Sequence, residues 1–100
     1  MSSGLVEPSF VFEGRALNYF NNAPGPIQAV LIAIASELCR DPAIDGETKL
    51  MVPIRADVGV SVYGRAYVGE RIWMHYDYED DPPPLLLIVK DCGLVSDLSN

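Results

Sequence analysis

Cysteine is scarce in this chain of 100 residues, which holds only Cys39 and Cys92. Two thiols are too few for a disulfide framework, and no C-x-x-C or His-Cys spacing places them beside other metal ligands. The sequence therefore predicts reduced, buried thiols in a cytoplasmic protein that needs no metal and no other cofactor.

A long apolar run is also lacking. The longest stretch, Ile27 to Ala35 with Gln28 inside it, is too short to span a bilayer as a helix. The N-terminus, MSSGLVEPSF, has neither the basic n-region nor the apolar h-region of a signal peptide. We expect a cytoplasmic protein that makes no contact with a membrane.

Basic residues are outnumbered, since seven Lys and Arg oppose fourteen Asp and Glu and leave a net charge of -7. Such a surface repels phosphate on average, which disfavours a general nucleic-acid binder, although a local cationic cleft can persist in a negative field. The charge serves solubility or attracts a basic partner, and the sequence leaves both explanations open.

The composition that remains is that of a globular domain, with 49% hydrophobic and 21% charged residues. At this length a second core would not fit, whereas one sheet with one helical layer is feasible. We expect a single domain over residues 1–100, with loose ends at 1–5 and 94–100.

The N-terminal part predicts a strand and a short helix. Residues 6–12 have the character of a short strand, placed at an edge because Pro8 removes a ladder donor. Leu17 and Phe20 lie three residues apart, as a two-turn helix from Arg15 to Asn22 requires.

A longer helix is predicted from Pro26 to about Arg40, where Asp41-Pro42 ends it. One broad apolar stripe should face the core, formed by Ile27, Val30, Leu31, Ile34, Ala35 and Leu38. The polar half is thin, because Ile32 and Cys39 fall on it or at its border. A partner or a second copy of the chain covers that side, or small alanines on a solvated face account for it; both remain open.

The middle of the chain predicts a loop and then a strand. Residues 43–57 are rich in turn formers and indicate a loop. Residues 58–63 alternate valine with Gly59, Ser61 and Tyr63, as in a half-buried strand, which Gly64 interrupts.

The C-terminal part predicts a tight turn at Val68-Gly69-Glu70 and a partner strand from Arg71 to Tyr78. After an acidic, proline-rich loop, residues 85–89 are continuously apolar and indicate a strand buried near the sheet centre, followed by a frayed tail. The fold class is therefore α+β, in the order β-α-α-β-β-β, with a mainly antiparallel sheet and two helices packed on one face.

The strand from Arg71 to Tyr78 has two different faces. Its more apolar set, which should meet the helices, is Ile72, Met74, Tyr76 and Tyr78, and the set left on the open side of the sheet is Arg71, Trp73, His75 and Asp77. His75 is the only histidine and titrates near neutrality, while Trp73 is able to stack on a base. The alternatives are a structural histidine, a tryptophan that caps a small cluster or a protein contact, and an arginine paired with a nearby carboxylate.

Several of these segments, in this order and spacing over about residues 9–93, resemble the RelE/ParE superfamily of bacterial toxins. The segments are a helix start at Arg15-Ala16-Leu17, a helix ending in SELCRDP, a loop with Lys49-Leu50, the hairpin VGERIWM, which is similar to a G-x-R-apolar-apolar-Y pattern, and the apolar strand LLLIVKDCG. The resemblance implies an antitoxin-like protein partner and, in the ribonuclease members, metal-independent cleavage of mRNA on the ribosome.

The resemblance also implies roles for individual residues. Arg71 aligns with the catalytic arginine of the hairpin, and Arg65 falls where a second basic residue usually lies. His75 is the candidate for proton transfer, because such chemistry needs a cation for the developing phosphate charge and a group that moves protons. The residues expected to contact RNA are Trp73, Tyr63 and Lys90.

The sequence departs from the active members after its last strand. There it reads KDCGLVSDLSN, in which Lys90 is the only basic residue and no tyrosine occurs. ParE-like relatives lack the ribonuclease residues and act on DNA gyrase, so the fold does not choose the activity. Two hypotheses follow: a toxin-family protein with reduced or lost ribonuclease activity, or a non-catalytic interaction module, such as a degenerate toxin or a homodimer-forming domain.

Overall fold

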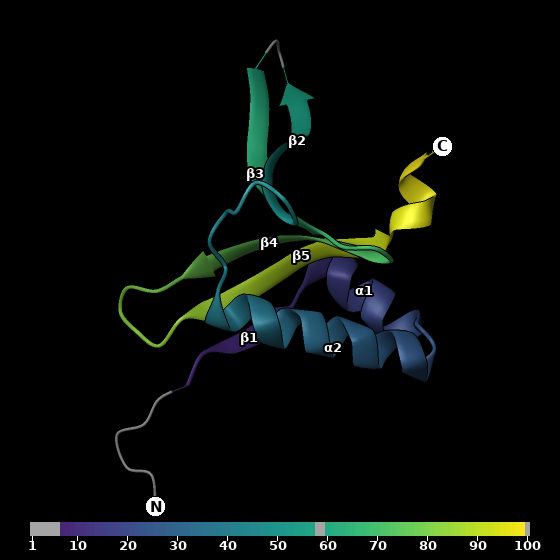
Figure 1. The fold of residues 1–100 in the computed structure, drawn as a ribbon, viewed down its shortest axis with the longest axis horizontal. Coiled ribbons are helices and arrows are strands. Elements are labelled where there is room, and N and C mark those ends of the chain that lie inside the picture. The colour runs from purple at the N-terminus through teal and green to yellow at the C-terminus, as the bar shows by residue number, and fades with distance from the viewer. Residues whose placement is uncertain (1–6, 58–59, 100) are drawn as a thin grey trace, which may run out of the picture.

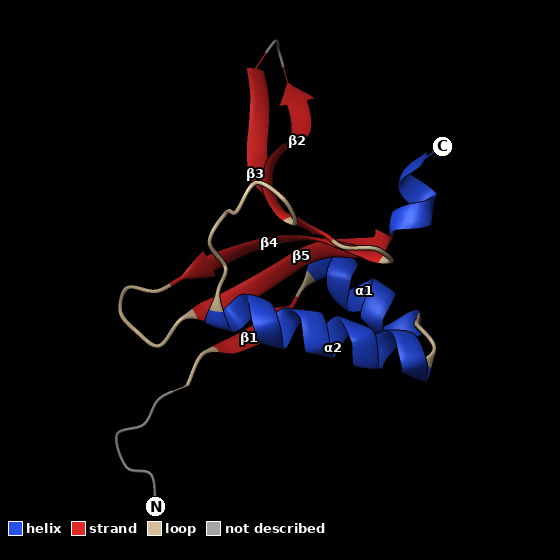
Figure 2. Ribbon diagram, viewed as in Figure 1, coloured by secondary structure: helices blue, strands red, loops and turns tan. Residues whose placement is uncertain are grey.

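The structure is a computed structural model that describes residues 7–57 and 60–99. It is an α+β fold in which two helices cover one face of a five-stranded sheet (Figures 1 and 2). The helices are α1 (Gly14–Asn22) and α2 (Gly25–Arg40), and the strands are β1 (Ser9–Phe12), β2 (Lys49–Asp57), β3 (Val60–Val68), β4 (Ile72–Glu79) and β5 (Leu86–Leu94). A short 3-10 helix, η1 (Val95–Ser99), follows. The predicted fold class is confirmed.

The sheet order is β1-β5-β4-β3-β2, with β1 parallel to β5 and all other neighbours antiparallel. The apolar strand β5 therefore lies inside the sheet, as its continuous hydrophobic run predicts. The first strand was predicted over residues 6–12; β1 occupies its second half, at the edge, and residue 6 lies outside the described part of the chain.

The core lies between the helices and one face of β4 and β5. Its largest fully buried side chains are Leu31, Ile72, Met74, Leu87 and Val89. Burying each such side chain contributes about 1.5–3 kcal/mol relative to leaving it in water. Ile72, Met74 and Tyr76 are buried, as the alternation along their strand predicted, so β4 turns its other face away from the helices.

Strand β2 corrects the predicted loop at 43–57, because residues 49–57 pair with β3. The sequence pattern did not indicate a strand here, because Pro53 has no N–H to donate to a neighbouring strand. A proline is tolerated there because β2 is an edge strand, and the ladder shifts register between Pro53 and Arg55. Strand β3 also continues through Gly64, so the predicted interruption is wrong, while residues 58 and 59 lie outside the described part of the chain.

The predicted frayed tail is wrong for residues 91–94, which complete β5, and residues 95–99 form η1. The turn predicted at Val68-Gly69-Glu70 is confirmed, since the Gly69 N–H donates to the Ile72 carbonyl at 3.0 Å. Arg71 lies in this turn and β4 begins one residue later.

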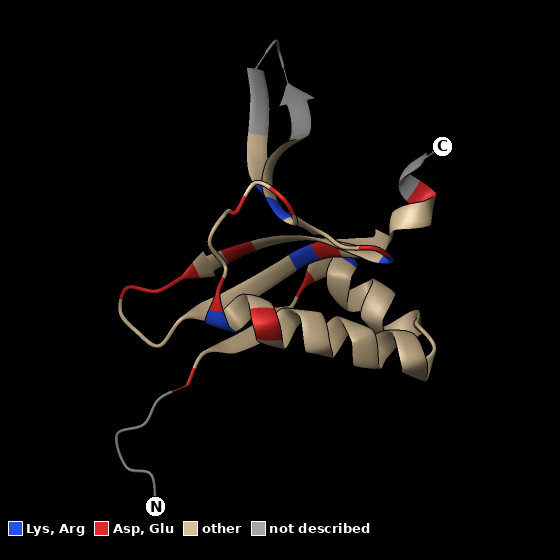
Figure 3. Cartoon of the chain, viewed as in Figure 1, with Lys and Arg blue, Asp and Glu red and all other residues tan. Residues whose placement is uncertain are grey.

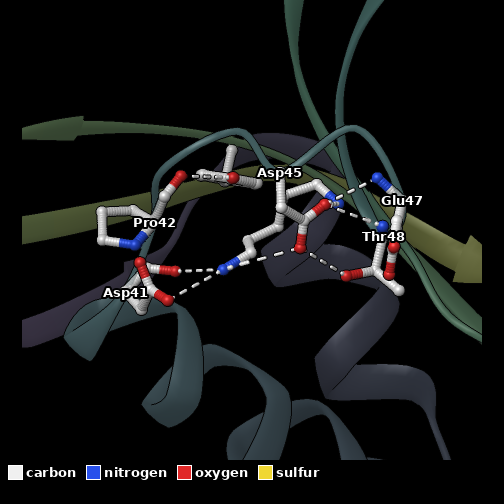
Figure 4. A network of polar contacts seen from close by, with 7 residues as sticks. Asp41, Pro42, Asp45, Glu47 and Thr48 are labelled. Carbon is white, nitrogen blue, oxygen red and sulfur yellow. Dashed lines mark hydrogen bonds and ion pairs between the residues drawn. The ribbon is translucent and has the colours of Figure 1, made fainter.

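The loop between α2 and β2 is held by the Asp45 carboxylate, which accepts backbone N–H groups from Glu47, Thr48 and Lys49 at 2.7, 3.0 and 2.9 Å (Figure 4). These three bonds lower the pKa of Asp45 to about 2. The Lys49 ammonium lies 3.3 Å from the Asp41 carboxylate, which joins the start of β2 to the end of α2.

The Tyr76 hydroxyl fastens the same loop to the sheet by donating to the Pro42 carbonyl at 2.7 Å.

In the part of the chain that the structure describes, no helix has the length and apolar character needed to cross a membrane.

Candidate functional site

The open face of β4 carries Trp73 and His75, as the alternation predicted. In the register of the sheet Trp73 lies between Val68 and Gly93, and His75 lies between Ala66 and Asp91. The ring centroids of Trp73 and His75 are 5.1 Å apart with an interplanar angle of 57°. The two aromatic groups therefore form one continuous surface on the side of the sheet away from the helices.

His75 is half-buried, and this burial lowers the pKa of its imidazole below the ordinary value of 6.5, while the nearby Asp91 carboxylate acts in the opposite direction. A neutral imidazole at neutral pH has a free ring nitrogen that accepts a proton. His75 is thus in the protonation state that a general base requires.

An irregularity in β5 places two charged residues next to His75. Tyr76 pairs with Val89 and His75 pairs with Asp91, so Lys90 is the extra residue of a bulge. Because Val89 and Cys92 are both buried in the core, Lys90 and Asp91 both leave it. The bulge therefore brings an ammonium and a carboxylate of the same strand to one histidine.

Asp91 is held by two contacts of its own. Its carboxylate accepts the Cys92 N–H at 2.9 Å and lies 3.8 Å from the exposed Arg15 guanidinium at the start of α1. An exposed pair at that distance contributes little to stability. By contrast, Lys90 is exposed and forms no ion pair with any described residue, so its charge is available to a ligand.

Beside His75 the sheet divides. Strands β3 and β4 pair only from Arg65 to Val68 on the β3 side, whereas β2 and β3 continue together as an arm that rises from the sheet (Figure 1). Arg65 bridges the point of division: its guanidinium lies 3.3 Å from the Asp77 carboxylate and 4.7 Å from the centre of the Tyr78 ring.

A cavity of about 310 Å³ lies at this division, and we call it the fork cavity. The residues that line it include Met51, Tyr63, Arg65, His75, Asp77 and Lys90. It therefore combines a neutral imidazole, an ammonium that has no ion pair among the described residues, and a guanidinium that shares its charge with a carboxylate. Such a set is able to bind an anion and to accept a proton.

A second cavity of about 240 Å³, the apolar cavity, lies on the same face, lined by Val52, Ala66, Val68, Trp73 and His75. No residue of this lining is charged at neutral pH, because the one titratable group is the imidazole of His75. His75 lines both cavities, so an apolar surface and a charged one meet at a single side chain.

The predicted RNA contacts Tyr63 and Lys90 thus line the fork cavity together with Arg65 and His75. Trp73 is adjacent to them, because its ring contacts that of His75. Arg71 is separate. It is exposed in the turn before β4, four residues from His75, which corresponds to about 13 Å along an extended strand. No ion pair joins Arg71 to another described residue, and the carboxylate Asp77 pairs with Arg65 instead.

The two predicted partner contacts on α2 differ in exposure. Ile32 is 43% exposed, as a contact surface requires. Cys39 is only 4% exposed and belongs to the core cluster, so its predicted position on the surface is wrong. Helix α2 packs against β1 and β5, and Cys39 shares the core cluster with residues of β5. Cys39 and Cys92 are both free and buried, as the scarcity of cysteine predicted.

Two residues of the site were missed in the sequence. Asp91 was assigned to the tail. Apolar residues resume after Lys90-Asp91, however, and two successive charged residues between apolar ones indicate a bulge. Val52 was assigned to a loop because residues 43–57 are rich in turn formers. Among the residues that the structure describes, no three His, Cys, Asp or Glu side chains are grouped so as to hold a metal ion.

Comparison of the chain with protein-family models, with curated proteins and with solved structures finds no match in any of the three.

Proposed function

We propose that the protein is a RelE/ParE-like toxin-family protein that binds RNA in the fork cavity and cleaves it slowly without a metal. The observation that supports the proposal is the position of Arg65, His75 and Lys90 around one cavity. Two of them are cations and one is a group that moves a proton, which are the two kinds of group that the reaction needs, and the three residues come from three different strands.

In the proposed reaction the ribose 2'-oxygen attacks the adjacent phosphorus and gives its proton to His75. The bond from phosphorus to the 5'-oxygen breaks, that oxygen takes a proton from a water molecule while His75 gives its proton to the resulting hydroxide, and a 2',3'-cyclic phosphate remains. Lys90 and Arg65 stabilise the charge that develops on the phosphate oxygens. Tyr63, which is exposed and lines the cavity, offers a ring for a neighbouring base.

A slow reaction follows from the pairing of Arg65 with Asp77, because a guanidinium that is already neutralised stabilises a phosphate less. Arg71 lies too far along β4 to replace it. The absence of one such stabilising group lowers a rate by roughly 100- to 1,000-fold. Asp77→Asn should therefore increase the rate of RNA cleavage, since it frees Arg65.

The test is inducible expression in a bacterium, together with incubation of the purified chain with single-stranded RNA in the presence of a chelator. The wild type should arrest growth and produce cyclic phosphate ends, and His75→Ala and Lys90→Ala should relieve both. Arg40→Ala, which removes an exposed cation at the end of α2, is the matched control and should behave as the wild type. A harmless wild type that leaves RNA intact contradicts the proposal.

Arg71→Ala distinguishes the catalytic role that the family resemblance implies for Arg71 from phosphate binding by Arg65 and Lys90 in the fork cavity. Loss of growth arrest in this variant shows that the bound RNA extends from the fork cavity to the turn before β4. Unchanged arrest assigns the phosphate to Arg65 and Lys90 alone.

A second candidate is a non-catalytic module that pairs with a copy of itself through the helices. No charged residue occurs between Ala16 and Ser36, and Figure 3 shows the helical layer almost free of charge. Leu17 and Ile32 are 44% and 43% exposed there. In a chain of net charge -7, this is a surface on which two copies meet without repulsion. Light scattering should then show a dimer that Ile32→Glu dissociates, and a wild-type monomer excludes it.

A further inference from the structure

The apolar cavity is not used by the reaction proposed above, although it shares His75 with the fork cavity. Its lining includes two aromatic residues, Trp73 and His75, whose ring centroids lie 5.1 Å apart. Aliphatic side chains of β2 and β3 form the rest: Val52, Ala66 and Val68. A flat, uncharged group is the natural occupant of such a lining.

The neighbouring charges narrow the choice of occupant. Lys90 is exposed and unpaired among the described residues, and it lines the fork cavity together with His75. A free phosphate would occupy only the fork cavity. An apolar side chain of another protein would occupy only the apolar cavity. A nucleotide fits both, because its flat base is joined to an anion. The chain as a whole repels anions, so the local cation decides where the phosphate binds.

We infer that the apolar cavity is a base pocket, in which Trp73 and His75 contact the base of the nucleotide whose 3'-phosphate lies in the fork cavity at Lys90. The inference rests on the proposed function, and it names the part of the RNA that the site recognises. The 2'-oxygen of this nucleotide is the one beside the attacked phosphate, so the pocket selects the base on the 5' side of the cut.

Trp73 is the only tryptophan, so the fluorescence of the purified chain reports on this cavity alone. At about pH 8, where an imidazole is neutral, three probes are titrated: adenosine 3'-monophosphate, adenosine and inorganic phosphate. Both adenosine compounds should quench Trp73 to saturation, with adenosine binding about fivefold more weakly because it lacks the contact with Lys90. Phosphate alone should leave the emission unchanged and should compete with adenosine 3'-monophosphate.

Two variants test the two ends of the nucleotide. Val52→Phe fills the apolar cavity and should weaken adenosine binding about tenfold or more. Ile44→Phe, at an exposed position in the loop before β2 and outside the lining, is its matched control. Lys90→Ala should reduce the affinity for adenosine 3'-monophosphate to that for adenosine and leave adenosine itself unaffected. If circular dichroism shows that Val52→Phe does not fold, Lys90→Ala alone tests the base pocket.

Absence of quenching by either adenosine compound overturns the inference, and so does quenching by N-acetyl-leucine amide in their place, which assigns the cavity to a protein side chain. RNA cleavage that persists in either case leaves the proposed function standing. Saturable quenching with no RNA cleavage has the opposite meaning: the base pocket is retained and the endoribonuclease is rejected.

Discussion

The Trp73 indole and the His75 imidazole lie 5.1 Å apart on the open face of the sheet, and the histidine is the only one in the chain. Burial lowers the pKa of His75 from the ordinary value of 6.5. A charged imidazole next to an indole quenches its fluorescence. We therefore expect Trp73 emission to decrease as the pH falls, with a midpoint below 6.5. The decrease should vanish in His75→Gln, and a midpoint at or above the ordinary value contradicts the burial argument.

The same shift makes stability depend on pH. Because the folded pKa of His75 lies below its unfolded value, the unfolded chain binds the proton more readily as the pH falls through about 6.5. The free energy of unfolding should be highest above this pH and should decrease below it until the folded pKa is passed. Urea unfolding between about pH 5.5 and 7 measures the slope, which His75→Gln should flatten, since carboxylates titrate lower.

At alkaline pH two buried groups act in the opposite direction. Burial raises the pKa of Cys92 to about 11 and that of Tyr76 to about 12. Their folded pKa values lie above the unfolded ones, so the stabilisation they give is complete below about pH 9 and is lost as the pH rises beyond it. Cys92→Ala should shift the onset of alkaline unfolding to higher pH. An unchanged onset would mean that the thiol does not control it.

Tyr76→Phe removes the hydroxyl that donates to the Pro42 carbonyl at 2.7 Å, while the ring stays in the core. Loss of one such bond should lower the free energy of unfolding by about 1 kcal/mol. Tyr63→Phe is the control, because Tyr63 is 58% exposed and its substitution should have almost no effect. Equal effects of the two substitutions in urea unfolding would show that the Pro42 bond does not hold the loop.

Gly93 is the residue against which Trp73 packs. A Cβ atom at this position would lie 3.1 Å from the indole Nε1 and 3.2 Å from Cε2 and Cζ2, which is tighter than most Cβ contacts and requires the ring to shift by a few tenths of an ångström. Gly93→Ala should therefore displace the ring, destabilise the protein by about 1–3 kcal/mol and shift the Trp73 emission. Gly25→Ala, where a Cβ meets nothing within 4 Å, should be neutral or stabilising.

How far the sequence predicts this molecule depends on the range of the interactions. The helices were predictable because Pro26 and Asp41-Pro42 act locally, and the faces of β4 were predictable because alternation is a local property of strands. Strand β2 was missed because Pro53 is acceptable only once the strand is known to be an edge, which depends on the whole sheet.

The candidate site was likewise predictable only where its geometry depends on local sequence. The side chains of Trp73 and His75 were placed on the open face by their spacing alone. Their neighbours were not, because Lys90 and Asp91 arrive through a bulge, and the fork cavity exists only where the arm of β2 and β3 leaves β4. The pairing of Arg65 with Asp77 spans that division and has no counterpart in local sequence.

The parallel pairing of β1 with β5 has a consequence for synthesis in the cell. Ser9 to Phe12 lie beside Leu86 to Val89, so β1 has no partner until the chain has been made as far as Val89. While the C-terminal segment is still inside the ribosome, the apolar faces of α1 and α2 have no β5 to cover them. Folding before that point is therefore limited to the helices and the pairing of β2 with β3, and the core closes only once β5 has left the ribosome. A ribosome that stalls before β5 emerges holds a chain with exposed apolar surface, which is a substrate for chaperones and proteases.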